Sequence, residues 1–91
     1  MIEAEVRNMT KEEIWGVSLQ RTAAFFRRQE DVTEEGVNVF RFRSCRIVLK
    51  EMKAASIGVW ASKRVKVRME GEDADVDAIY HRFFMQFLSQ G

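Results

Sequence analysis

The chain has 91 residues, of which 46% are hydrophobic and 32% charged, and this composition excludes a disordered protein. Its length suits a single domain with a genuine core. The formal net charge of +1 conceals a strong asymmetry: residues 1–40 carry −3, residues 41–68 carry +8 and residues 69–91 carry −4. Segregation of this kind creates a local electric field that the net charge does not reveal.

Several classes of protein do not fit the sequence. The single cysteine, Cys45, cannot form an internal disulfide, so nothing requires an oxidising compartment. The first ten residues, MIEAEVRNMT, include acidic residues and lack the apolar core of a signal peptide. No apolar run approaches the ~18 residues that a membrane-spanning helix requires. We therefore expect a soluble, cytoplasmic protein without a membrane partner.

The first third of the chain predicts a strand, a helix and a loop. Residues 2–8 alternate between apolar and charged side chains, which is typical of a short strand. Thr10 and Glu13 then have the spacing of a capping box, in which each side chain accepts from the other residue's backbone N–H. An apolar stripe follows, so the pattern predicts a helix over residues 11–28. Residues 29–36 are expected to form a loop.

Residues 37–43 predict the next strand. Phe40 and Phe42 fall on one side of it, and Arg41 and Arg43 fall on the other. The phenylalanines therefore indicate the buried face, and the arginines indicate the exposed one.

The following segment is less uniform. Residues 45–52 alternate like a strand but also contain good helix formers, and we favour a strand that leads into a turn at 51–56. Residues 57–70 predict at least one further strand, which Gly71 is expected to end.

The clearest helix follows in EDADVDAIYHRFFMQFLSQ. Its apolar residues recur at helical spacing: Val76, Ile79, Tyr80, Phe83, Phe84, Phe87 and Leu88. Three aspartates crowd its start, where the helix dipole favours negative charge. We therefore expect one α+β domain over residues 1–91, in the order β-α-β-β-β-α, with two amphipathic helices packed on one face of an antiparallel sheet.

One core is expected between the helices and the sheet. Its predicted members are Met9, Ile14, Trp15, Leu19, Phe26, Phe40, Phe42, Val65, Val67, Ile79, Tyr80, Phe83 and Phe87.

Catalytic and metal-binding patterns are weak in this sequence. A dyad of Cys45 and His81 lacks any third group, and one histidine with one cysteine does not supply a metal site. DADVD begins like a calcium loop, but the required glycine and glutamate are replaced by Ala78 and Phe84. The five glycines are scattered, so no phosphate-binding loop is present. We expect no enzymatic activity, no cofactor and no metal.

The basic segment carries the functional hypothesis. On two neighbouring strands, the arginines and lysines opposite the apolar positions should emerge together on the open face of the sheet. The candidate binding residues are Arg41, Arg43, Arg46, Lys50, Trp60, Arg64, Lys66 and Arg68. A basic sheet that also carries an aromatic ring is typical of small domains that bind RNA or single-stranded DNA, because cations contact phosphates and the ring stacks on a base.

Two other interpretations fit the same residues. An antiparallel sheet covered on one side must be polar on the other, so its cations can simply face solvent or pair with the acids of residues 30–35 and of the last helix. Alternatively, the chain is a protein-interaction or assembly subunit, such as a homodimer in which the +8 segment of one copy meets the acidic ends of another.

Overall fold

The computed structural model describes residues 6–52 and 63–88. In chain order, its elements are β1 (Asn8–Trp15), α1 (Leu19–Arg27), β2 (Thr33–Gly36), β3 (Val39–Phe42), β4 (Cys45–Met52), β5 (Arg64–Glu72) and α2 (Asp73–Phe87). The strands form one sheet in the order β1-β5-β4-β3-β2, with every neighbouring pair antiparallel.

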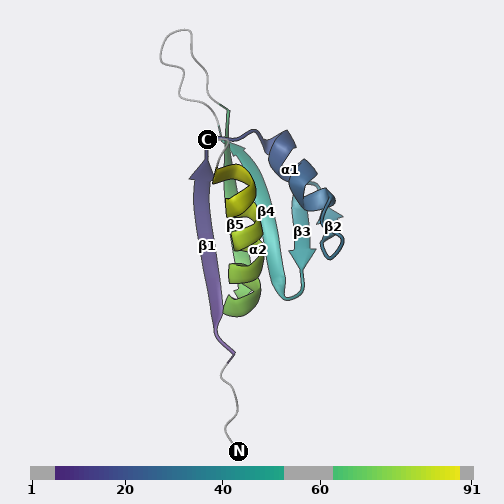
Figure 1. The fold of residues 1–91 in the computed structure, drawn as a ribbon, viewed down its shortest axis with the longest axis vertical. Helices are drawn as coiled ribbons and strands as arrows, with labels where there is room; N and C mark the ends of the chain where they lie inside the picture. Colours follow the sequence, from purple (N-terminus) through teal and green to yellow (C-terminus); the bar gives the residue numbers. More distant parts are fainter. Residues whose placement is uncertain (1–5, 53–62, 89–91) are drawn as a thin grey trace, which may run out of the picture.

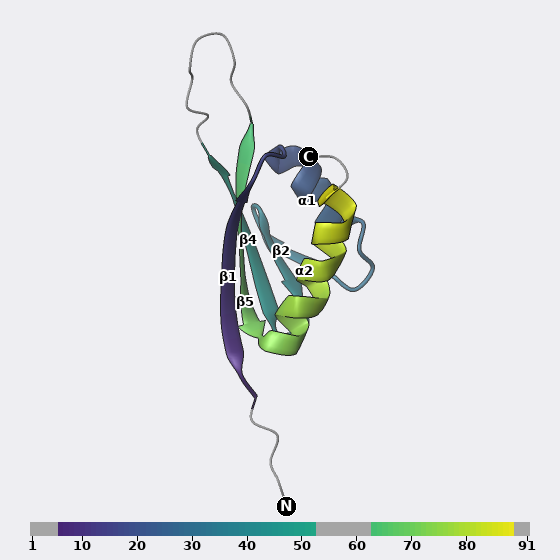
Figure 2. The ribbon, with the colours of Figure 1, turned by 60° about the vertical axis from the view of Figure 1, so that its left-hand side comes forward.

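Both helices lie on the same face of this sheet, and the other face is open (Figures 1 and 2). The predicted α+β class and two-layer architecture are therefore confirmed. The described part of the chain has one strand more than expected, because β2 lies in the segment predicted to be a loop.

The first strand corrects the prediction for the N-terminal third. Residues 8–15 pair in unbroken register with β5, from Asn8 opposite Glu72 to Trp15 opposite Val65. The capping-box pattern at Thr10 and Glu13 therefore does not start a helix. Tertiary pairing overrides the local helix signal here, because β1 gains a full ladder of hydrogen bonds with β5.

Helix α1 begins eight residues later than predicted. Its N-cap is Ser18, whose Oγ accepts from the backbone N–H of Arg21 at 3.2 Å. Thr22, Ala23, Phe25 and Phe26 of α1 are buried against the sheet. The second half of the predicted helix is therefore helical, with its apolar side buried, whereas residues 11–18 are not part of a helix.

Two tight hairpins join the short strands. The β2–β3 turn contains Asn38 with φ of 61°, and the β3–β4 turn contains Arg43 with φ of 54°. Asparagine tolerates this left-handed conformation better than most residues, whereas for arginine it is uncommon. The predicted strand over 37–43 is accordingly shorter, and Arg43 belongs to the turn.

The central strands agree best with the sequence. Residues 45–52 form β4, which confirms the strand interpretation of that ambiguous segment. The turn predicted at 51–56 falls partly on β4 and otherwise outside the described residues. Strand β5 starts at Arg64 and continues through Gly71 to Glu72, so Gly71 does not end it.

The core lies between the helices and the sheet. Eight of the predicted members are buried: Phe26, Phe40, Phe42, Val65, Val67, Ile79, Phe83 and Phe87. Met9, Trp15, Leu19 and Tyr80 are partly buried and pack against this core. Ile14 is 53% exposed, because it lies on the open face of β1. Residues that the prediction left out complete the core: Val17, Ala23, Phe25, Cys45, Ile47, Leu49, Met69 and Val76.

Candidate functional site

The open face of the sheet gathers most of the predicted basic residues. On β4 and β5 the buried side chains are Cys45, Ile47, Leu49, Val65, Val67 and Met69, so the residues between them point away from the helices. Six of the eight candidates lie on this open face: Arg41, Arg46, Lys50, Arg64, Lys66 and Arg68.

Arg43 is the candidate that the structure moves elsewhere. Its Cζ lies 4.7 Å from the ring centroid of Phe42, which is buried on the helix side. Its Nη1 is 3.7 Å from Oδ1 of Asp75 in α2. The two-residue alternation predicted it beside Arg41, but the hairpin turn interrupts that alternation. Trp60 lies outside the described residues.

Like charges face one another across two pairs of strands on the open face. Arg41 of β3 lies directly opposite Arg46 of β4, and Lys50 of β4 lies directly opposite Lys66 of β5. Like-charged residues at such positions are destabilising. The strand register therefore concentrates positive charge where stability alone would disperse it.

Acidic residues flank these pairs and neutralise their outer members. Oε2 of Glu35 is 3.0 Å from Nε of Arg41. On the other side, Oε1 of Glu12 is 2.9 Å from Nζ of Lys66, and this contact holds the pKa of Glu12 below its ordinary value. Arg68 lies between Glu12 and Glu70, at 3.6 and 3.3 Å. The face is therefore basic but partly compensated.

Three cations on this face have no acid partner among the described residues: Arg46, Lys50 and Arg64. Residues 53–62, KAASIGVWAS, contain no Asp or Glu. Two of the three cations are on β4, the middle strand of the sheet. The uncompensated charge thus runs along its centre.

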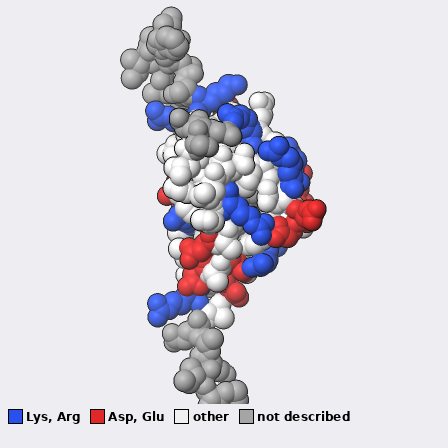
Figure 3. Space-filling model, in the orientation of Figure 1, with Lys and Arg blue, Asp and Glu red and all other residues white. Residues whose placement is uncertain are grey.

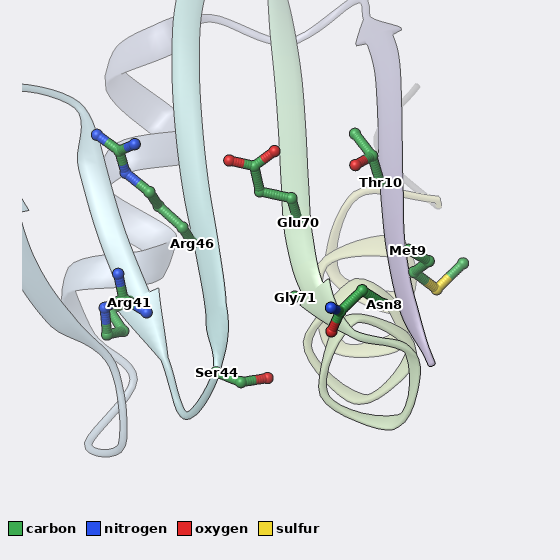
Figure 4. Close-up of a pocket in the computed structure, with 8 residues that line it drawn as sticks. All are labelled: Asn8, Met9, Thr10, Arg41, Ser44, Arg46, Glu70 and Gly71. Atoms are coloured by element: carbon green, nitrogen blue, oxygen red, sulfur yellow. The ribbon is translucent and has the colours of Figure 1, made fainter. Parts of the chain in front are cut away.

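A groove of about 440 Å³ lies at the Ser44 end of the open face (Figure 4). A row across the sheet forms its wall, with Thr10 opposite Glu70, Glu70 opposite Arg46, and Arg46 opposite Arg41. Figure 4 shows the two arginines on neighbouring strands, with the carboxylate of Glu70 extending from β5. The groove offers cationic donors on one side and an acceptor on the other.

Sequence reasoning missed the β1 side of this surface. Asn8 and Thr10 line the groove and Glu12 pairs with Lys66. The prediction ended a strand at Asn8, made Thr10 a helix cap and placed Glu12 in the helix over residues 11–28. The alternation of Thr10, Glu12 and Ile14 was the available signal, and the stronger capping-box pattern concealed it.

Aromatic side chains lie on the other side of the sheet. Phe83 of α2 is at the centre of a ring cluster, with centroids 4.9 Å from Trp15, 5.9 Å from Phe26 and 5.2 Å from Phe87. No aromatic side chain of residues 6–52 or 63–88 faces the open side. The stacking part of the hypothesis therefore rests on Trp60 alone, which the structure does not describe.

The helix face has a different charge pattern (Figure 3). Acidic side chains gather where α2 begins, and Asp73 and Asp75 lie in its first turn. Farther along, Arg82 forms a bidentate pair with Asp31 at 2.8 and 2.9 Å. This pair holds the pKa of Asp31 below its ordinary value. Asp31 and Asp75 are therefore engaged on this side, whereas Glu12, Glu35 and Glu70 pair with cations of the open face.

The remaining chemical groups offer little reactivity. Cys45 is fully buried, and burial raises the pKa of its thiol to about 11, so the nucleophilic thiolate is scarce at neutral pH. His81 is exposed on α2. Within the described ranges, no three His, Cys, Asp or Glu side chains cluster closely enough to hold a metal ion. Nor is any helix of these ranges long and apolar enough to cross a membrane.

Comparison of the chain with protein-family models, with curated proteins and with solved structures finds no match.

Proposed function

We propose that the open face of the sheet binds a single-stranded nucleic acid, RNA or single-stranded DNA, through its phosphates, and that the protein is a binding module without catalytic activity. The observation that carries this proposal is the pair of like-charged cross-strand contacts, Arg41 opposite Arg46 and Lys50 opposite Lys66. A polyanion lying over them relieves the repulsion that each pair otherwise retains.

The spacing of the cations favours a chain of phosphates over a single small anion. Arg46 and Lys50 are four residues apart on one strand, which corresponds to about 13 Å. One phosphate is too small to bridge two side chains attached this far apart, whereas the extended backbone of a nucleic acid can follow the strand and place a phosphate at each. Arg64 on β5 continues the same uncompensated surface.

The groove at the Ser44 end suits one nucleotide of such a strand. Arg41 and Arg46 can donate to a phosphate, and their guanidinium planes can stack on a base. Glu70 is an acceptor for the amino group of a base. In this arrangement, the groove gives a modest base preference to binding that is otherwise electrostatic.

The opposed charge blocks favour assembly less. Glu72, Asp73 and Asp77, where α2 begins, have no ion-pair partner among the described residues. Part of the acidic charge that a homodimer of that kind needs, however, is engaged within the chain, since Asp31 is paired with Arg82 and Glu34 with Arg27. Glu12 and Glu35 are likewise paired with cations of their own chain. We therefore place nucleic-acid binding first.

The test is a titration of a fluorescent mixed-sequence oligonucleotide, as RNA and as DNA, at several salt concentrations. With about four phosphate contacts, the slope of log K against log salt should be about −3 on a single strand. Replacing Arg46→Gln together with Lys50→Gln should flatten that slope by about 1–2 units, because up to two counterion-releasing contacts are lost.

The matched control removes two cations from the other layer, as Arg21→Gln with Arg28→Gln. This double variant loses the same charge as the test variant but leaves the open face intact. Its slope of log K against log salt should therefore stay close to that of the parent. Equal losses in both double variants would indicate a non-specific charge effect. Failure of the parent to bind either oligonucleotide at low salt would exclude the proposal.

A further inference from the structure

Strand β1 is a long, regular sheet edge that no other described strand or helix covers. It has β5 on one side only, and it pairs with β5 over all eight residues without a register shift. The opposite edge, β2, is four residues long and contains a register shift between Glu34 and Gly36. Proteins blunt an edge by shortening it, by bulging it, as at β2, or by placing charged side chains on it, and β1 carries Lys11, Glu12 and Glu13. Strand β1 is neither short nor bulged, and Figure 1 shows no described element beyond it.

One hydrogen bond tells which backbone groups of β1 face outward. The carbonyl of Arg7 accepts from the N–H of Asp73 at 2.8 Å, just beyond the last register pair of β1 with β5. Polar groups of an antiparallel strand alternate in direction, so the odd-numbered residues turn theirs toward β5. The N–H and C=O groups of Asn8, Thr10, Glu12 and Ile14 therefore point to the free side.

Two exposed apolar side chains lie along the same edge. Val6 is 65% exposed and Ile14 is 53% exposed. Ile14 lies on the open face of β1, and Val6 precedes the strand by two residues. If the strand alternation continues back to Val6, both side chains fall on the open face, eight residues apart. The two side chains do not form one patch, but antiparallel pairing with a second copy brings the Val6 of one chain beside the Ile14 of the other.

We propose that β1 pairs with β1 of a second copy of this chain, antiparallel and across a two-fold axis at Thr10. The axis places Thr10 opposite Thr10. It also places Val6 of each copy opposite Ile14 of the other, so the Val6–Ile14 pair occurs twice in the dimer. Arg7 then faces Glu13, which forms an opposite-charge pair on the helix side of the strand. Cross-strand pairs of these three kinds are favourable.

The charges of β1 select this register. In an antiparallel pair, two opposed residues lie on the same face of the sheet. Because faces alternate along a strand, the numbers of two opposed residues are both odd or both even. The two-fold axis therefore passes between the two copies of one residue. Of the two-fold axes at residues 9 to 13, only the axis at Thr10 gives a register in which no two like charges face each other. An axis at Met9 sets Arg7 against Lys11, and axes at 11, 12 and 13 set Lys11, Glu12 and Glu13 each against itself.

The contacts of Glu13 are compatible with the proposed pair. Tyr80 and the indole N–H of Trp15 both donate to Oε1 of Glu13, at 2.7 and 3.0 Å. Oε2 of Glu13 has no hydrogen-bond partner among the described residues and is available to Arg7 of the second copy. The dimer joins two five-stranded sheets edge to edge and sets both open faces on the same side.

Light scattering after size-exclusion chromatography tests the pairing, over about 1 µM to 1 mM protein. The parent should be a dimer at the upper end. Val6→Lys should raise the dimer dissociation constant about tenfold or more, because it replaces two apolar pairs with a cation beside Ile14. Val37→Lys is the control: Val37 is 89% exposed in the β2–β3 turn, so dimerisation should not change.

Cysteine cross-linking tests the register independently. Thr10→Cys should form an intermolecular disulfide on mild oxidation, because hydrogen-bonded pairs have Cα atoms about 5.5 Å apart. Asn8→Cys should not, since the two copies of residue 8 lie about 13 Å apart in this register. A parent that is monomeric throughout, a Val6→Lys variant that dimerises like the parent, or equal cross-linking at positions 8 and 10 would each overturn the proposal.

Discussion

The hydroxyl of Ser44 in the β3–β4 turn donates to Oδ2 of Asp75 in the first turn of α2, at 2.6 Å. The same hydroxyl oxygen accepts from the backbone N–H of Glu72 at 3.0 Å, and the Ser44 N–H donates to Oδ2 of Asp75 at 3.2 Å. One serine, far away in sequence, therefore satisfies the backbone N–H of Glu72, the N-cap residue of α2, whose own side chain makes no capping hydrogen bond. This contact ties the helix layer to the basic edge of the groove.

Replacing Ser44→Ala should destabilise the fold by about 1–2 kcal/mol, because a helix N–H loses its partner. Urea unfolding measures the change. Thr33→Ala is the control, since its side chain is exposed on an edge strand and makes no hydrogen bond within the described residues. A loss no larger than that of the control would contradict the capping role.

The stability effect of Ser44→Ala should also depend on pH. Hydrogen bonds from Ser44 hold the pKa of Asp75 below its ordinary value. A depressed carboxyl pKa contributes stability above the pKa of the unfolded chain, and that contribution is lost as the pH falls through the folded pKa. The difference between parent and variant should therefore shrink as the pH is lowered from about 6 to below 4. A constant difference would mean that Asp75 is not part of the contact.

Local and non-local signals explain why the sequence predicted some elements and not others. Helix α2 repeats one period over its length, so its pattern was sufficient; the alternation of β4 favoured a strand, although the same residues include good helix formers. Strand β1 was missed because Thr10 and Glu13 have the spacing of a helix start, while its partners on β5 lie 50 to 64 residues away in the chain. Nothing local to MTKEEI reports that partner.

The candidate face was predicted for the same reason that α2 was. Alternation on β4 and β5 is regular, so Arg46, Lys66 and their neighbours were assigned to the correct side. Arg43 was misassigned because alternation ends where a turn begins, and arginine is not a typical turn residue. The acids that compensate the face were harder to place, since Glu12 lies on the missed strand.

Phe83→Ala should cost about 3–5 kcal/mol of unfolding free energy, as for other buried aromatic residues. The side chain is fully buried and contacts rings from β1, α1 and α2. Phe84→Ala provides the comparison, because that half-buried ring touches Trp15 at the margin and should cost less. Chemical denaturation distinguishes the two. A loss below about 1 kcal/mol for Phe83→Ala would mean that α2 does not pack against the sheet in this way.

Gly71 allows β5 to approach the start of β4. A Cβ at this position would lie 2.6 Å from the carbonyl oxygen of Ser44 and 2.7 Å from Cα of Cys45, which are backbone atoms that cannot rotate away. We expect Gly71→Ala to destabilise the protein by about 1–3 kcal/mol. At Gly16 a Cβ meets nothing within 4 Å, so Gly16→Ala should be neutral or slightly stabilising. Thermal unfolding of both variants measures the contrast, and similar midpoints would contradict the close approach.

Tyr80 permits a direct test of the β1–α2 contact by titration, because it is the chain's one tyrosine. Burial and its hydrogen bond to Glu13 raise the pKa of Tyr80 to about 12. Absorbance of tyrosinate should therefore show a midpoint near 12 in the native protein and, in denaturant, near the ordinary value of about 10.

The raised pKa of Tyr80 also makes the free energy of unfolding depend on pH in alkaline solution. A raised pKa contributes stability that is complete below about pH 10 and is lost as the pH rises toward 12, because the unfolded chain gives up its proton first. The free energy of unfolding of the parent should fall over this range more steeply than that of Tyr80→Phe, which has no proton to lose. Glu13→Gln should lower the native midpoint, since it removes the charge that disfavours tyrosinate. A native midpoint near 10 in the parent would show that Tyr80 does not meet Glu13, and that the C-terminal end of β1 is not held against α2 as described.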